Sequence, residues 1–219
     1  MEENHGVLIV CAHSDDQILG CGGTIAKYSK QGIPVHTIIM SYGEKAMPHL
    51  KEEFVIKTRV NETHKANEIV GGKNVFFLGL KEGKFKKGIE ETGAEEKIIN
   101  IINKYNIKKI FTHSSFDTDI PNRDHNITYK LVKKICKGID VELYTFTIWD
   151  FFKAKGELAK SIKLIEDISS TMKLKSRAIH AYQTQFFQMS IPYIQMYIYS
   201  FLNGLKYGYK FAEVFIKEK

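Results

Sequence analysis

The chain has 219 residues and a mass of 25.2 kDa, with 43% hydrophobic residues, 26% charged residues and a formal net charge of +7. This composition is that of a globular protein with its own core, and it excludes a collagen, a coiled coil and a disordered chain. We expect a single domain over residues 1–219.

The positive charge comes from lysine rather than arginine. Arg59, Arg123 and Arg177 are the only arginines among 32 basic residues, and the lysines are scattered instead of forming one basic tract. Proteins that read nucleic acids depend on arginine for bidentate contacts. We therefore expect a solvated surface and no nucleic-acid partner.

Targeting signals are not expected in this chain. No run of about 18 apolar residues predicts a transmembrane helix, and the acidic start at residues 1–5 is not typical of a signal peptide. Cys11, Cys21 and Cys136 are odd in number and form no CxxC pair. This pattern indicates reduced core thiols, and we expect a cytoplasmic location.

Short apolar runs alternate with helical patterns through the first 150 residues. We expect five strands, at residues 7–11, 35–40, 75–78, 107–112 and 141–147. We expect helices between them, one ending near residue 31 and others over 51–70, 94–105 and about 126–137. This alternation predicts an α/β, Rossmann-like fold with a mostly parallel sheet flanked by helices, and a site at the carboxyl ends of the strands.

The pattern changes after residue 150. Residues 157–180 are lysine-rich and predict one long helix, and residues 186–202 form an amphipathic segment with several aromatic and methionine residues. Such a segment can be a subunit interface, the rim of a substrate site or core. We expect core or self-association, and hence a possible homo-oligomer.

A first polar cluster, Ala12-His13-Ser14-Asp15-Asp16-Gln17, directly follows the first predicted strand. An imidazole and a carboxylate three residues apart can bind one metal ion from a tight turn, with Asp15 directed toward a water on that ion. The alternative is that Asp15 or Asp16 caps the next helix and that His13 is an ordinary loop residue.

A second polar cluster runs from His113 to His125 after the fourth predicted strand, and includes Asp117, Asn122 and Asp124. His125 offers a third ligand and leaves one position open for water, as in a catalytic zinc site. An ordinary polar loop with a helix cap is the alternative. The two clusters together match a metal hydrolase, in which the ion lowers the pKa of water and a carboxylate accepts its proton.

The first cluster and the residues after it, Ala12-His-Ser-Asp-Asp-Gln-Ile-Leu-Gly-Cys-Gly-Gly23, resemble the AHPDDE…GxGG signature of the LmbE-like (PIG-L) N-deacetylases. Further segments resemble later motifs of that family in the same order: Ser41-Tyr-Gly43-Glu44, Arg59…Glu62…Ala66, Leu78-Gly-Leu-Lys-Glu-Gly83, Asn122-Arg-Asp124-His125, Lys175…Tyr182-Gln-Thr-Gln185 and Ala212-Glu213-Val-Phe215. The resemblance thus runs through nearly the whole chain.

The resemblance implies a zinc-dependent deacetylase in which His13, Asp16 and His125 bind the metal. Asp15 is then the general base, and Arg59 lies on a helix that contacts substrate. The implied reaction is hydrolysis of the acetamido group of an N-acetylglucosamine unit or conjugate, which releases acetate and a free amine. Because histidine and carboxylate ligands suit several ions, another divalent transition metal is possible.

Asp124 is the second catalytic candidate that the resemblance implies, orienting a metal ligand or Asp15. Asn122 and His113 are expected, with Arg59, to contact the substrate. Three residues depart from the family pattern, since Ser14 replaces proline, Gln17 replaces glutamate and Asn122 replaces the first histidine of H-x-D-H.

The departure at Asn122 leaves the acid that protonates the amine unidentified, because an amide cannot supply a proton. We expect Asp15 to shuttle the proton, with His113 or weak catalysis as the alternatives. Two other functions stay open, a zinc amidohydrolase of a non-sugar N-acyl amine and an inactive sugar- or nucleotide-binding module.

Overall fold

The computed structural model describes residues 5–47, 49–117, 123–148 and 161–219. Within these residues, seven strands form one sheet in the order β3-β2-β1-β4-β5-β7-β6. The strands are β1 (Gly6–Cys11), β2 (Val35–Ser41), β3 (Val75–Leu80), β4 (Ile107–His113), β5 (Glu142–Phe146), β6 (Lys163–Asp167) and β7 (Ala212–Lys217). β7 is antiparallel to both of its neighbours, and the strands from β3 to β5 are parallel, so the predicted α/β fold with a mostly parallel sheet is confirmed.

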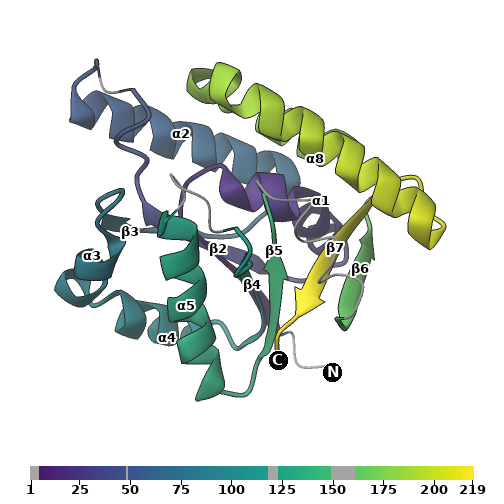
Figure 1. Ribbon diagram of the computed structural model, residues 1–219, viewed down its shortest axis with the longest axis horizontal. Helices are drawn as coiled ribbons and strands as arrows, with labels where there is room; N and C mark the ends of the chain where they lie inside the picture. The colour runs from purple at the N-terminus through teal and green to yellow at the C-terminus, as the bar shows by residue number, and fades with distance from the viewer. Residues whose placement is uncertain (1–4, 48, 118–122, 149–160) are drawn as a thin grey trace.

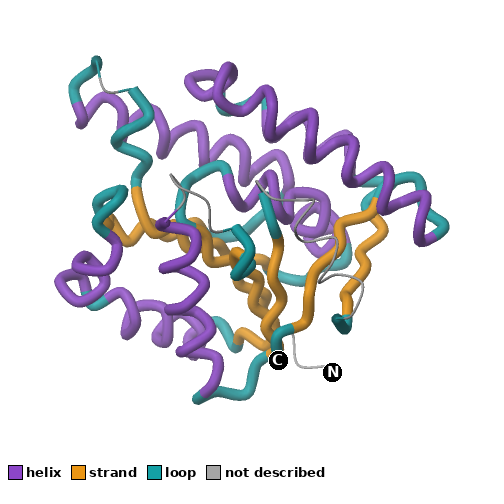
Figure 2. Tube along the Cα trace, in the orientation of Figure 1, coloured by secondary structure: helices purple, strands orange, loops and turns teal. Residues whose placement is uncertain are grey.

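Helices cover both faces of the sheet (Figures 1 and 2). They are α1 (Asp16–Lys30), α2 (Glu52–Val70), α3 (Phe85–Thr92), α4 (Ala94–Lys104), α5 (Arg123–Lys137), α7 (Met172–Ile179) and α8 (Phe186–Tyr207), with a 3₁₀ turn, η1 (Gln183–Gln185), before α8. One buried cluster joins the sheet to α1, α2, α7 and α8, and a second joins the other face to α3, α4 and α5.

The end of the helix predicted over 51–70 is determined by the glycine that follows it. α2 ends at Val70, and Gly71 follows in the left-handed conformation at φ 74°, with its N–H bonded to a carbonyl of the last turn. A glycine adopts this conformation without the steric cost that a Cβ atom brings. The five predicted strands and the other helices predicted before residue 148 also lie within a few residues of their expected bounds.

The long helix predicted over 157–180 is wrong over most of its described part. Residues 163–167 form strand β6, and only Met172–Ile179 is helical; residues 149–160 lie outside the described part of the chain. β6 obtains its hydrogen bonds from β7, which lies more than 40 residues further along the chain. Helical spacing of a short Lys-Leu-Ile-Glu-Asp run cannot anticipate that pairing. β7 was not among the predicted strands either.

The order of the parallel strands creates a switch point at the centre of the sheet. The chain adds β2 and β3 on one side of β1, then returns to place β4 and β5 on the other side. Connections leave β1 and β4 in opposite directions at such a point, and a crevice opens beyond the carboxyl ends of these two strands. The two polar clusters follow these two strands. Among the described residues, no helix combines the length and apolar character needed to cross a bilayer.

Candidate metal centre

The switch point brings the two polar clusters into direct contact. β1 pairs with β4 from Gly6↔Ile107 to Val10↔Thr112, so the segments that follow both strands emerge side by side. The backbone N–H of Ala12 donates to Nε2 of His113 at 3.1 Å, which joins the two segments at their first residues. A carboxylate of the first cluster therefore lies among histidines of the second.

His13, Asp16 and His125 place one donor atom each around a common point. His13 Nδ1 is 3.2 Å from His125 Nε2 and 3.5 Å from Asp16 Oδ2, and His125 Nε2 is 3.4 Å from Asp16 Oδ2. An ion bound tetrahedrally through bonds of about 2.0–2.1 Å separates its ligand atoms by about 3.3–3.4 Å. The three donors therefore fit a metal ion, and this group is a candidate metal site.

Each of these histidines has a second carboxylate near its other ring nitrogen. Asp117 Oδ2 accepts a hydrogen bond from His125 Nδ1 at 2.9 Å, and Asp124 Oδ2 lies 3.7 Å from His13 Nε2. Asp124 Oδ2 is itself held by the backbone N–H of Gly83 at 2.7 Å. Carboxylates in these positions fix the orientation and tautomer of metal-binding histidines.

Asp117 also supports His113, and sequence reasoning gave it no role. Its Oδ2 lies 3.1 Å from His113 Nδ1, and the His113 ring stacks on the His125 ring with centroids 3.9 Å apart. Burial alone would raise the pKa of Asp117, but hydrogen bonds from His113 and His125 outweigh it and hold that pKa well below its usual value. The ionised carboxylate makes both Nδ1 atoms donors, so Nε2 of His125 carries a lone pair that can bind a metal ion. The feature of the sequence that could have indicated this role is the position of Asp117 four residues after His113 in the second polar cluster.

The pKa values of the three candidate ligands depend on burial and on the charges of their neighbours. Burial opposes ionisation of Asp16, yet His125 and His113 hold its pKa well below the usual value. Burial and the neighbouring His113 lower the pKa of His125, which favours the neutral ring that binds a metal. Burial also disfavours a charged His13, but Asp124 and Asp16 more than offset this and raise its pKa. The raised pKa means that His13 tends to hold an extra proton between these carboxylates. A metal cation bound to His13 can replace that proton and its positive charge.

The Asp15 side chain does not cap the helix. This residue occupies the position before α1, but its side chain makes no capping hydrogen bond, and Asp16 Oδ2 instead accepts from the backbone N–H of His13 at 2.8 Å. Asp15 Oδ2 lies 3.5 Å from Nη2 of Arg59, and the Asp15 side chain is 16% exposed. The helix-cap interpretation of these two carboxylates is therefore wrong, and Asp15, which precedes the candidate ligand Asp16 in the chain, is partly accessible to water.

Arg59 is buried on α2 with unused hydrogen-bonding capacity. Its Nε and Nη1 atoms have no hydrogen-bond partner among the described residues, and its guanidinium lies 5.8 Å from the ring centroid of Tyr182. Gly43, with φ 76°, passes so close that a Cβ atom there would lie 2.8 Å from Arg59 Nε. A buried cation with free donors at the edge of the site can bind a polar group of a ligand.

Gln17, one of the departures from the family pattern, supports the first cluster from beneath. It is fully buried, and its Nε2 donates to the backbone carbonyl of Ser14 at 3.0 Å and to the hydroxyl of Tyr182 at 2.8 Å. The Tyr182 hydroxyl also donates to the Ser14 carbonyl. A side-chain amide and a phenol thus hold the turn that carries the ligands, without adding a charge.

Two other residues, His113 and Asn122, were expected to contact the substrate. His113 is completely buried behind His125, with its two nitrogens bonded to Ala12 and Asp117, so in this structure it supports the site rather than lining its surface. Asn122 lies outside the described residues. Glu82, which sequence analysis left without a role, lies near His13 and Arg59, and burial raises its pKa.

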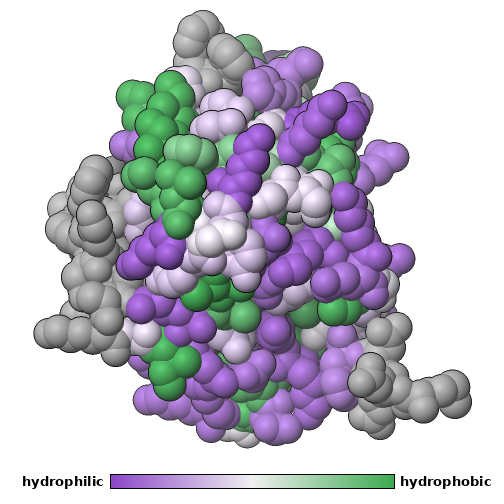
Figure 3. Space-filling view, turned by 90° about the vertical axis from the view of Figure 1, so that its right-hand side faces the viewer, coloured by the Kyte–Doolittle hydropathy of each residue, from purple (hydrophilic) through white to green (hydrophobic). Residues whose placement is uncertain are grey.

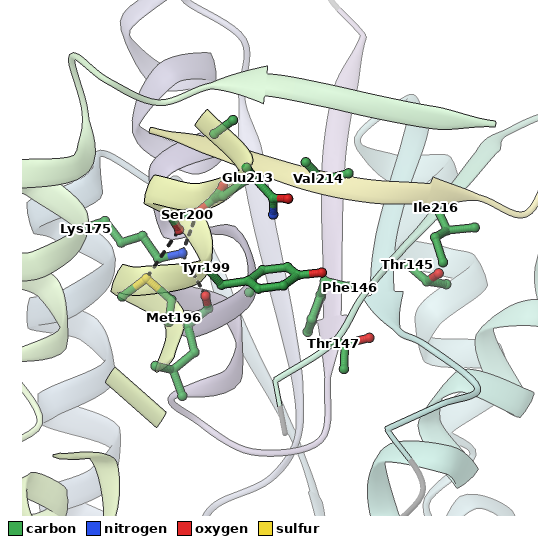
Figure 4. Close-up of a pocket in the computed structure, with 14 residues that line it drawn as sticks. Thr145, Phe146, Thr147, Lys175, Met196, Tyr199, Ser200, Glu213, Val214 and Ile216 are labelled. Carbon is green, nitrogen blue, oxygen red and sulfur yellow. Dashed lines mark hydrogen bonds and ion pairs between the residues drawn. The ribbon is translucent and has the colours of Figure 1, made fainter. Parts of the chain in front are cut away.

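A pocket lies between α8 and the diverging ends of β5 and β7 (Figure 4). It is lined in part by Lys175 and Glu213, which form a buried ion pair at 2.6 Å. Lys175 Nζ donates to the carbonyl of Leu19, and the Glu213 carboxylate accepts from the N–H groups of Gly23 and Thr24. These two late-motif residues therefore bind the backbone of α1, whose first turn carries Asp16.

Sequence relatives of the chain include two enzymes of different reaction type. A 1D-myo-inositol 2-acetamido-2-deoxy-alpha-D-glucopyranoside deacetylase of Nocardia farcinica is 45% identical over 40 residues, which are 18% of this chain and 13% of that protein. A 4-oxalmesaconate hydratase of Pseudomonas putida is 34% identical over 77 residues, which are 32% of this chain and 30% of that protein. The chain thus matches less than a third of the length of either relative.

Solved structures share the fold over almost the whole chain. The N,N'-diacetylchitobiose deacetylase from Pyrococcus horikoshii superposes with a TM-score of 0.79 at 20% identity, covering 97% of this chain and 83% of that one. GalB, the 4-carboxy-2-hydroxymuconate hydratase of Pseudomonas putida, superposes with a TM-score of 0.81 at 19% identity, covering 98% and 96%. At these identities the likeness shows the fold alone.

A family model settles the relationship that the motifs indicated. The model of the PIG-L family, described as GlcNAc-PI de-N-acetylase, matches residues 8–136, which is more than half of the chain and includes both polar clusters. The matched region therefore contains the candidate metal ligands, the carboxylates beside them and Arg59. The chain belongs to the PIG-L deacetylase family.

Proposed function

We propose that this protein is a zinc-dependent N-deacetylase that hydrolyses the acetamido group of an amino sugar or its conjugate. The observation that carries the proposal is the convergence of His13, Asp16 and His125 at separations that fit a tetrahedral ion, with the partly exposed Asp15 adjacent to Asp16 in the chain. Two imidazoles and one carboxylate form the ligand set of catalytic zinc sites that keep a position open. Family membership supports the reaction type.

The bound ion would supply Lewis acidity to the acetamide carbonyl and to water. The protein supplies the proton transfers, and Asp15 is the group placed for them. Its carboxylate is accessible to water and is oriented by Arg59, which lies 3.5 Å away. We propose that Asp15 accepts the proton of the attacking water and delivers it to the nitrogen of the leaving amine, since Asn122 cannot act as an acid.

Two carboxylates have positioning roles in this proposal. Asp117 holds His125, and Asp124, fixed by the N–H of Gly83, lies against His13. Arg59 has donors left over to bind an oxygen of the substrate. We assign His113 to the support of His125, because it is buried and stacked on that ring.

Hydration of an unsaturated carboxylate is the second candidate, because the Pseudomonas relative is named a hydratase. The match to the PIG-L family model favours the deacetylase over this candidate. A hydratase would also leave an amide substrate unchanged, so one experiment separates the two.

The test follows acetate release by proton NMR with purified protein and one equivalent of zinc. The substrates are N-acetylglucosamine, its short oligomers, a nucleotide-linked form and a simple N-acetyl amine without a sugar. Asp15→Asn is the matched control, with metal content measured in both proteins. We expect acetate from the wild type and no turnover from Asp15→Asn at equal metal content. Release from the simple amine alone would replace the sugar by another acyl substrate. Bound metal without any acetate would refute the deacetylase.

A further inference from the structure

Helix α8 directs a row of large apolar side chains into solvent. The exposed set consists of Ile191, Ile194, Tyr197, Ile198, Phe201, Leu202 and Leu205, which we call the α8 face. Ile191 is 64% exposed and Leu205 is 60% exposed. Figure 3 views the molecule from the side at which α8 ends, and hydrophobic side chains gather at the upper left of that view. Soluble monomers rarely expose a contiguous apolar surface of this kind.

The polarity of α8 is the reverse of that of an ordinary surface helix. Over residues 190–207, the part of α8 whose burial is described, the buried positions recur every four residues and are Pro192, Met196, Ser200 and Gly204. Gly204 lies so close to Lys210 that a Cβ atom would meet its backbone at 2.6 Å. The small inner residues let α8 lie close to the domain, while the larger apolar residues point away from it. A helix that is more apolar on its outer face is normally covered on that face as well.

The α8 face has the spacing of a helix–helix seam. Ile191, Ile194, Ile198, Phe201 and Leu205 follow one another at intervals of three, four, three and four residues. This is the alternation of the a and d positions of a coiled coil, in which each side chain packs between residues of a facing helix. A narrow seam of this kind fits a second helix better than it fits the broad surface of a membrane.

The size and the charge of the α8 face indicate the same occupant. Seven side chains that are 39–64% exposed present roughly 750 Å², which is close to the about 800 Å² that each partner of a stable complex buries. Between residues 186 and 207, Lys206 is the only charged residue. A helix that lies on an anionic membrane carries lysine and arginine along its polar face, and α8 does not.

We propose that α8 packs against α8 of a second copy of this chain, antiparallel and about a two-fold axis near Ile198. Ile198 is the midpoint of the seam between Ile191 and Leu205, so an antiparallel pair brings the two Ile198 side chains together. A parallel pair would instead place the two copies of Lys206, in the last turn of α8, side by side, and like charges repel. Closed two-fold dimers are also the commonest homo-oligomers.

Disulfide trapping tests both the interface and its direction. Ile198→Cys places two thiols at the axis, and we expect rapid oxidation to a covalent dimer with twice the 25.2 kDa chain mass. Ile191→Cys is the matched control, because in an antiparallel pair the two copies of residue 191 are about 21 Å apart at 1.5 Å per residue. The three native cysteines are buried, so background cross-linking should be low. Equal cross-linking of both variants would overturn the antiparallel arrangement.

Light scattering of the wild type and of Ile198→Glu/Leu205→Glu tests the association without a cross-link. We expect a dimer for the wild type and a monomer for the variant, with an unchanged circular dichroism spectrum because both side chains are exposed in the single chain. Phe54→Glu, which alters an exposed residue of α2, serves as the control and should stay dimeric. A monomeric wild type at 100 µM would overturn the proposal, and flotation of that monomer with anionic vesicles would assign the α8 face to a membrane.

Discussion

Asp117 gives the most direct test of the metal centre, because it touches two histidines without being a candidate ligand in the tetrahedral group. Its Oδ2 accepts from Nδ1 of His125 at 2.9 Å and from Nδ1 of His113 at 3.1 Å, and the residue is 1% exposed. Asp117→Asn keeps the size of the side chain and an oxygen that can accept both hydrogen bonds. It removes the negative charge that strengthens them.

The expected effect follows from the strength of those two hydrogen bonds. A hydrogen bond to a charged group contributes about 1 kcal/mol more than a neutral one. Two weakened bonds therefore amount to about 2 kcal/mol, which corresponds to a metal affinity lower by about 30-fold. Both bonds should affect the affinity, because His125 Nε2 is one of the three donors that surround the candidate site and the His113 ring stacks on the His125 ring.

The assay is competition for zinc against a chelator of known affinity, with the wild type and Asp117→Asn at the same pH. Asp140→Asn is the control, because it removes a carboxylate of the same size that is exposed and paired with Lys108. Circular dichroism and urea unfolding of the metal-free proteins separate a loss of fold from a loss of affinity. An affinity within threefold of the wild type, in a folded protein, would show that Asp117 does not orient His125 for a metal.

Three further predictions concern groups around the site. Lys175→Met should lower the free energy of unfolding by about 3–5 kcal/mol, measured by urea titration, because Glu213 is left buried and charged, and a loss below about 1 kcal/mol would contradict this. Gly43→Ala should reduce the turnover of acetate release at least tenfold at unchanged metal content, because its Cβ atom displaces Arg59 from Asp15; wild-type turnover would show that this placement is not needed. Burial raises the pKa of Cys136 to about 11, so alkylation at pH 8 should be at least 100-fold slower in the native protein than in urea. Since only the unfolded state loses that proton between about pH 8.5 and 11, this thiol should make folding less favourable as the pH rises through that window, and native alkylation as fast as in urea would contradict the burial.

The candidate ligands could be recognised from the sequence because each one belongs to a local pattern. His13 and Asp16 directly follow a buried strand, and His125 belongs to a polar cluster after another. Parallel strands end at one edge of a sheet, so the fold class alone was sufficient to predict that these clusters lie near each other. Asp117 had the same position and was not assigned a role, because its contacts with two imidazoles depend on how the loop after β4 folds back.

The late elements show the opposite case. The strand β6 depends on β7 for its hydrogen bonds, so the local pattern of residues 163–167 favoured a helix that the structure does not contain. The apolar residues over 186–202 do form a helix, but the sequence could not tell which of its faces is buried. Both outcomes depend on contacts between segments that are far apart in the chain.

The sequence by itself determined the alternating α/β architecture, the two polar clusters and the family to which the chain belongs, because each is written in short-range patterns of residue type. Only the tertiary structure decided the spacing of the three donor atoms, the support that Asp117 and Gln17 give them, and the exposure of the α8 face. The physical reason is that hydrogen-bond geometry and burial depend on the packing of residues distant in sequence. A pattern can place such residues at the same edge of a sheet, but only the folded chain sets the distances between their atoms.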